Sequence, residues 1–231
     1  MINEWLCVDE NEWHEGVSQR VAQLLRSAIA ERGQALLAVS GGRSPIGMFQ
    51  RLRTRDLDWS KVIITLADER WVPGDHADSN AALVRKYLLQ GPAAQAQFLP
   101  LYNDAATPHE GRADCDAALR ALPLPFDCVV LGMGEDGHTA SFFPDAEELA
   151  CALALDTAAL CWPVTPPKAP HLRMTLTQHA LLHESRQLLL AIEGKTKRQI
   201  YERARTEPSL TYPVSQLLHQ DECPIDVWIE E

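Results

Sequence analysis

The sequence predicts an α/β fold with three layers (α/β/α), in which helices cover both faces of a mainly parallel, doubly wound, Rossmann-like sheet. Two observations predict it. Short apolar runs alternate with amphipathic stretches along the whole chain. These runs are continuously apolar, as expected for parallel strands that are buried on both faces. No repeat or flexible linker is visible in the 231 residues, so we expect one domain over residues 1–231.

The elements follow from these patterns in order along the chain. The predicted strands are Trp5–Val8, Leu36–Ser40, Val62–Ala67, Cys128–Leu131, Leu160–Val164, Leu188–Ile192 and Ile225–Ile229. The first predicted helix has an apolar face of Val17, Val21, Leu24, Ala28 and Ile29 and ends at Gly33, a residue suited to a helix C-terminus. The other predicted helices are Pro45–Leu52, Ser79–Leu89, His109–Leu122, Thr177–His183 and Lys195–Arg205. The Pro-rich stretch 162–170 is predicted to be an extended loop.

Composition excludes several classes of protein. The longest uninterrupted apolar run, Leu149–Leu155, is far shorter than the roughly 20 residues that cross a bilayer. The net charge of −11 argues against nucleic-acid binding, which needs a basic surface. The first residues lack the features of a secretory signal, and the six cysteines are scattered, so we expect reduced thiols, no metal site and a cytoplasmic location.

Ligands of open α/β sheets bind beyond the carboxyl ends of the strands, and three loops in such places are unusual. The first, Gly41–Pro45, opens a helix. Its glycines permit close approach of a ligand to the backbone, Ser44 is suited to the N-cap and Pro45 to the first helical position. Free N–H groups at this helix end could bind a phosphate, although a tight turn without a ligand would read the same way. The Lys-Ser/Thr ending of a nucleoside-triphosphate loop is missing.

The second loop begins with three charged residues, Asp68, Glu69 and Arg70, directly after a predicted buried strand. Such charges are costly to bury without partners. They fit the mouth of a binding site in which Arg70 pairs with a carboxylate, and equally a solvated strand end. Whether Glu69 faces the site stays open at this point.

The third loop, Gly132–Ser141, contains a Gly-x-Gly-x-x-Gly pattern. A dinucleotide-binding loop would continue into a long helix, but Phe143 and Pro144 interrupt the pattern here. A better interpretation is catalytic. His138 is held on a Gly-rich turn and could act as a general base near neutral pH, with Asp136 close enough to orient its ring.

Two cations later in the chain are candidates for an anion site. Arg173 follows the Pro-rich loop, and Lys195 lies at the start of a predicted helix, where its charge opposes the helix dipole. A nearby anion would explain that placement, and a solvated surface charge is the alternative for each residue.

Five segments in this order resemble the 6-phosphogluconolactonases, within the wider group that contains glucosamine-6-phosphate deaminase/isomerase. The segments are Ser40–Pro45, Asp68–Val72, Gly132–Ser141, Arg173–Thr177 and Gly194–Lys195. The resemblance implies hydrolysis of 6-phospho-D-glucono-1,5-lactone to 6-phospho-D-gluconate in the oxidative branch of the pentose phosphate pathway. It implies no cofactor, a phosphosugar lactone as the small-molecule partner, and a monomer or small homo-oligomer.

The resemblance also implies roles for particular residues. His138 would be the general base that activates water, with Asp136 beside it. The residues implied to bind the substrate are Gly41, Gly42, Arg43, Ser44, Arg173 and Lys195 at the phosphate and Asp68 and Arg70 at the sugar.

Two alternatives use the same pocket. The deaminase/isomerase branch is similar up to His138 but carries an acidic residue near the proline that closes the third motif, where this chain has Phe143. Isomerisation needs acid and base groups that move protons between adjacent carbons, so this difference favours hydrolysis. The other alternative is a sugar-phosphate-binding protein without catalysis.

Overall fold

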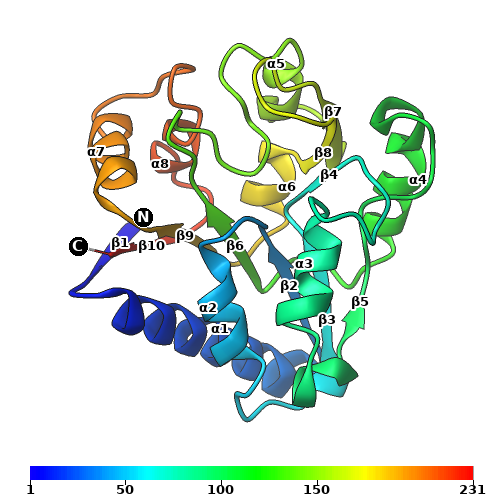
Figure 1. Ribbon diagram of the computed structural model, residues 1–231, viewed down its shortest axis with the longest axis vertical. Helices are drawn as coiled ribbons and strands as arrows, with labels where there is room; N and C mark the ends of the chain where they lie inside the picture. Colours follow the sequence, from blue (N-terminus) through cyan, green and yellow to red (C-terminus); the bar gives the residue numbers. More distant parts are fainter. Residues whose placement is uncertain (231) are drawn as a thin grey trace.

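A seven-stranded parallel sheet forms the centre of the molecule, in a computed structural model that describes residues 1–230 (Figure 1). Its strand order is β1-β10-β9-β6-β2-β3-β5. The strands are β1 (Ile2–Cys7), β2 (Ala35–Val39), β3 (Val62–Leu66), β5 (Gln97–Phe98), β6 (Cys128–Gly132), β9 (Leu188–Ile192) and β10 (Ile225–Glu230). The predicted α/β class with a mainly parallel sheet is confirmed. That one domain spans residues 1–231 stays a prediction, and residue 231 lies outside the described part.

Helices cover both faces of this sheet. The α-helices of the described chain are α1 (Glu10–Arg32), α2 (Pro45–Leu52), α3 (Asn80–Tyr87), α4 (Pro108–Arg120), α5 (Leu149–Leu153), α6 (Gln178–His183), α7 (Lys195–Ala204) and α8 (Ser215–Leu218). Of these, α4 and α5 pack mainly against a strand outside this sheet, β7 (Cys161–Val164). The chain winds from β1 towards β5 through α1, α2 and α3, and returns from β5 to β10 through the later helices. Because parallel crossovers are right-handed, the two directions of winding place the two groups of helices on opposite faces, as Figure 1 shows. Among residues 1–230, no helix has the length and apolar character needed to cross a membrane.

Local sequence accounts for the ends of the longest helix. The carboxylate of Asp9 accepts a hydrogen bond from the N–H of Glu12 and caps the first turn of α1. At the other end, Gly33 has a φ of 78° and its N–H donates to the carbonyl of Ile29, which confirms the predicted stop. Between these ends, Val17, Val21 and other apolar side chains are buried against the sheet.

A second, antiparallel sheet has three strands in the order β4-β8-β7. These are β4 (Asp68–Arg70), β8 (Arg173–Leu176) and β7 (Cys161–Val164). The sequence predicted β7 as one more strand of the parallel sheet, and that placement is wrong. It predicted neither β4 nor β8, because their charged residues are not typical of strands. These segments become strands only through cross-strand pairing.

The two directions of winding meet between β2 and β6, which are neighbours in the central sheet. The loop after β2 leads to α2 on one face, while the loop after β6 leads towards the opposite face. A crevice opens at the carboxyl ends of strands where the winding reverses in this way. This is the place to look for a ligand site.

Candidate active site

A cavity of about 220 Å³ lies at this reversal point. The loop after β2, the loop after β6 and the side chains of Asp68 and Arg70 on β4 surround it. Of the residues predicted for the site, seven line the cavity: Gly41, Gly42, Arg43, Ser44, Asp68, Arg70 and His138. Asp136, Arg173 and Lys195 do not line it. The structure therefore brings the three unusual loops together, although they are far apart in the sequence.

The Gly-rich loop forms one end of the cavity. Gly42 has a φ of 95°, which favours glycine, and a Cβ on Gly41 would collide with the side chain of Asn80, 1.8 Å from its Oδ1. Pro45 begins α2 as predicted. The N–H groups of Gly42, Arg43 and Ser44 have no acceptor within residues 1–230, so they are available to an anion.

Ser44 differs from the prediction in one respect. It lies at the N-cap position of α2, but its hydroxyl makes no capping hydrogen bond. Instead its Oγ lies 3.5 Å from the Nζ of Lys197, a side chain that also lines the cavity. The two groups converge on the same end of the cavity as the free N–H groups.

Lys197, rather than Lys195, is the lysine that α7 presents to the cavity. Lys195 is the first residue of the helix and its side chain is exposed. Lys197 lies two residues further along the helix and therefore on a different face, where its side chain points to the loop after β2. The first turn of α7 holds no acidic residue, so its cations oppose the helix dipole without internal compensation. An anion bound in the cavity would compensate the charge of these cations.

At the other end of the cavity, His138 and Asp136 form a close pair. The Nδ1 of His138 lies 2.5 Å from the Oδ1 of Asp136, which also accepts the N–H of residue 138 at 3.1 Å. Burial acts to raise the pKa of Asp136, but its hydrogen bond to His138 and the charge of that ring outweigh burial and lower the pKa. Because the carboxylate holds Nδ1–H, the Nε2 of His138 carries the free lone pair.

Glycines permit this close pair. The loop turns back on itself through hydrogen bonds from Gly134 N–H to the carbonyl of His138 and from Gly137 N–H to the carbonyl of Gly134. A Cβ on Gly134 would lie 2.3 Å from the His138 ring and 2.7 Å from Asp136. The Gly-x-Gly-x-x-Gly pattern thus forms a turn around a histidine, with no helix directly after it.

The ring of Phe143 packs against the imidazole of His138. The two ring centroids are 4.4 Å apart, and Phe143 is buried. The guanidinium of Arg173 lies over the same phenyl ring, with its Cζ 5.6 Å from the centroid. Burial lowers the pKa of Arg173, while the nearby charge of Asp68 opposes that shift. The structure thus buries Arg173 in contact with Phe143, and Arg173 does not line the cavity in which it was expected to bind the phosphate.

The three charges of β4 point in different directions. Asp68 lines the cavity, and its Oδ2 accepts the Ser141 hydroxyl at 2.7 Å. Glu69 faces away and is fully buried, where it accepts the N–H groups of Asn80 and Ala81 at the start of α3. Burial raises the pKa of Glu69, and these backbone hydrogen bonds oppose the shift. Arg70 returns to the cavity, and its Nη1 donates to the carbonyl of residue 78 at 2.7 Å.

Lys197 and Asn80 are polar cavity residues that the sequence did not single out. Lys197 had a signal, because it lies in the same cationic helix start as Lys195, but helix phase alone did not choose between them. Asn80 is buried with its Oδ1 unpaired among residues 1–230, and its Nδ2 donates to the carbonyl of Asp68. Nothing in its sequence context pointed to the site.

Comparisons with known proteins show which family the chain resembles. A family model described as glucosamine-6-phosphate isomerases/6-phosphogluconolactonase matches residues 8–225. A 6-phosphogluconolactonase of Pseudomonas aeruginosa is 50% identical over 186 residues, which cover 80% of this chain and 78% of that protein. The crystal structure of a 6-phosphogluconolactonase from Shewanella baltica superposes with a TM-score of 0.96 at 40% identity, covering 100% of this chain and 98% of the other.

The same fold also occurs in a monomeric glucosamine-6-phosphate deaminase, with a TM-score of 0.81 at 18% identity over 99% of this chain and 97% of that one. This likeness concerns the fold alone. The family match covers nearly the whole chain and includes every loop around the cavity. The chain therefore belongs to the family of glucosamine-6-phosphate isomerases and 6-phosphogluconolactonases.

Proposed function

We propose that this chain is a 6-phosphogluconolactonase, which hydrolyses 6-phospho-D-glucono-1,5-lactone to 6-phospho-D-gluconate in the oxidative branch of the pentose phosphate pathway. One observation carries the proposal. A histidine with a carboxylate partner and an anion-binding end with a lysine lie in one cavity of about 220 Å³. Relatives that are 40–50% identical and named 6-phosphogluconolactonase support the same activity. A cytoplasmic location and a monomer or small homo-oligomer belong to the proposal as well.

The substrate phosphate would occupy the end formed by Gly42, Arg43, Ser44 and Lys197. Backbone N–H groups at the start of α2 and the Lys197 ammonium would donate charge-assisted hydrogen bonds to its oxygens. Lys197 replaces Lys195 in this proposal because it faces the cavity. Binding at the remote phosphate would hold the lactone carbonyl near His138.

His138 would then act as general base. Its Nε2 takes a proton from a water molecule as the water oxygen attacks the lactone carbonyl carbon. The tetrahedral intermediate collapses when the bond to the ring oxygen breaks, and the imidazolium returns the proton to that oxygen. Asp136 keeps Nδ1 protonated and stabilises the imidazolium, so it is a positioning residue. Water and lactone are consumed, and one hydroxy acid is formed.

Arg173 would act indirectly in this scheme. It lies over Phe143, which packs against His138, so it fixes the position of the base rather than binding the phosphate. The same contact bears on the deaminase alternative. An apolar ring occupies the space beside His138 where a second proton-transferring carboxylate would be needed.

The decisive experiment compares the wild-type chain with His138→Ala in a lactonase assay corrected for spontaneous ring opening. We expect kcat to fall by about 10²–10⁴-fold, because positioned acid–base catalysis contributes that much. Equal rates in the two proteins would refute the assignment of the base. Release of ammonia from glucosamine 6-phosphate by the wild type would favour the deaminase, and ligand binding without turnover would favour a binding protein.

A further inference from the structure

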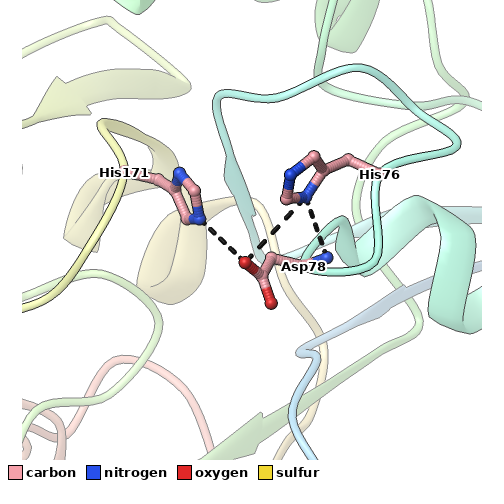
Figure 2. A group of neighbouring side chains, drawn as sticks. All are labelled: His76, Asp78 and His171. Carbon is pink, nitrogen blue, oxygen red and sulfur yellow. Dashed lines mark hydrogen bonds and ion pairs between the residues drawn. The ribbon is translucent and has the colours of Figure 1, made fainter.

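A cluster of two histidines and one aspartate lies outside the cavity, next to its rim (Figure 2). The Nε2 of His171 is 2.9 Å from the Oδ2 of Asp78, and the Nδ1 of His76 is 3.9 Å from the same oxygen. One nitrogen or oxygen atom from each of the three side chains lies within 4.8 Å of the other two. Figure 2 shows both imidazole rings turned towards the carboxylate. The proposed hydrolysis uses none of these side chains.

The fold, rather than chance exposure, brings the three together. His76 and Asp78 lie in the loop between β4 and α3, whereas His171 ends the Pro-rich loop before β8. The antiparallel pairing of Arg70 with Arg173, continued by a hydrogen bond from Trp71 N–H to the carbonyl of Leu172, holds the two loops side by side. His171 is also in the left-handed region, with a φ of 67°. That conformation is uncommon for a residue other than glycine, and here it directs the ring at Asp78.

The proton positions suit a metal ion. The Nδ1 of His76 accepts the backbone N–H of Asp78 at 3.1 Å, so this nitrogen carries no proton, and an ion would replace that N–H as the partner of its lone pair. The Nε2 of His171 faces a carboxylate oxygen, so it donates its proton to Asp78. An incoming divalent ion would take Nδ1 of His76, Nε2 of His171 and one carboxylate oxygen of Asp78. The Nε2 proton of His171 would pass through solvent to Nδ1 of the same ring, so that the imidazole binds the ion in its neutral form.

We propose that His76, Asp78 and His171 bind a divalent transition-metal ion of the Zn²⁺, Co²⁺ or Ni²⁺ type. Two imidazole nitrogens and one carboxylate oxygen match the ligand preference of these ions, and three protein ligands leave a position for water. The neighbouring Arg70 donates to the backbone carbonyl of Asp78, so it does not compete with the ion for the carboxylate. The ion would link the two loops at the rim and fix the carbonyl that holds Arg70 in the cavity.

The test uses the intact chain and Co²⁺ as the probe, in an equilibrium titration followed by calorimetry and visible absorption. We expect one ion per chain, with d–d bands and no thiolate charge-transfer band. His171→Gln and His76→Gln should each weaken binding at least about tenfold. Without metal, both variants should unfold within about 2–4 °C of the wild type, because His76 is exposed and His171 loses one partly exposed ion pair. With metal at about 100 times the wild-type Kd, the wild type should gain about 5–10 °C in Tm, and each variant at most about half of that gain.

The chain offers a matched control in α6. His179 and His183 lie one turn apart with their Nδ1 atoms 3.1 Å from each other, so they form a competing histidine pair. The double variant His179→Gln/His183→Gln should retain wild-type affinity within about twofold. Loss of binding in this control and its retention in His171→Gln would overturn the proposal. So would the absence of saturable binding, or a thiolate band showing that the exposed Cys151 holds the ion.

Discussion

Lys197→Ala should weaken substrate binding far more than Lys195→Ala, although the two lysines are only two residues apart. Lys197 lines the cavity with its Nζ 3.5 Å from Ser44, whereas Lys195 is exposed at the start of the same helix. The two variants remove the same charge from the same helix end. Only their position relative to the cavity differs, so each serves as the control for the other.

The expected magnitude follows from the setting of Lys197. A hydrogen bond between charged groups contributes about 1.5–3 kcal/mol. At 1.36 kcal/mol for each factor of ten, its loss corresponds to about 10–150-fold in KM. A direct Coulomb estimate for unit charges 4 Å apart near a protein surface gives about 4 kcal/mol and sets the upper bound. An exposed charge such as that of Lys195 contributes about 0–1 kcal/mol, so its removal should change KM less than about fivefold.

The assay measures kcat and KM for 6-phosphogluconolactone at fixed ionic strength, corrected for spontaneous hydrolysis. Loss of uniform binding raises KM, and any fall in kcat for Lys197→Ala reports lost positioning of the carbonyl. Higher salt should narrow the difference between wild type and Lys197→Ala, because it screens the phosphate contact. Equal increases in KM for the two variants, or an unchanged KM for Lys197→Ala, would refute this account of the phosphate end.

Three further variants, with Gly132→Ala as a control, test the catalytic end and the buried carboxylate of β4. Gly134→Ala should lower kcat by about 10²-fold with little change in KM, because the new Cβ displaces His138. Gly132→Ala is the control, and it should lower kcat less, because its Cβ meets nothing within 4 Å. Equal losses of kcat in the two variants would contradict the reasoning. Asp136→Asn should lower kcat by at least about 10²-fold through loss of the correct tautomer, and a kcat near wild type would exclude that role. Because folding lowers the pKa of Asp136, its ionised carboxylate stabilises the folded state at pH values above the unfolded-state pKa near 4. This stabilisation is lost as the pH falls through the lower pKa of the folded state. Urea unfolding of wild type and Asp136→Asn should therefore converge in acid, and a constant difference would count against the pair. Glu69→Gln should reduce the free energy of unfolding by about 1–3 kcal/mol, because an amide cannot accept all the N–H groups that the buried carboxylate accepts, and an unchanged urea midpoint would count against this.

Much of the fold was predictable from local pattern. Continuous apolar runs predicted β2, β3, β6, β9 and β10 to within about one residue at most ends, because strands buried on both faces need no partner to be recognised. The first and last residues of helices were also predictable from residues nearby in the sequence. The Gly33 stop is an example, because the conformation it adopts depends on the residue itself.

The short antiparallel sheet was not predictable in this way. β4 consists of three charged residues, and β8 begins with an arginine. They are strands because each completes the hydrogen bonds of the other, and that pairing joins residues about a hundred positions apart. The cluster of His76, Asp78 and His171 depends on the same pairing, so it too was absent from the sequence analysis.

By itself the sequence indicated the three loops that meet at the cavity: a Gly-rich helix start, a charged strand end and a histidine on a glycine turn. Each depends on residue type and on the few neighbours along the chain. Only the tertiary structure decided which side chains reach the shared cavity. It favoured Lys197 over Lys195 and placed Arg173 behind Phe143, because the direction of a side chain depends on helix phase and on packing between distant segments.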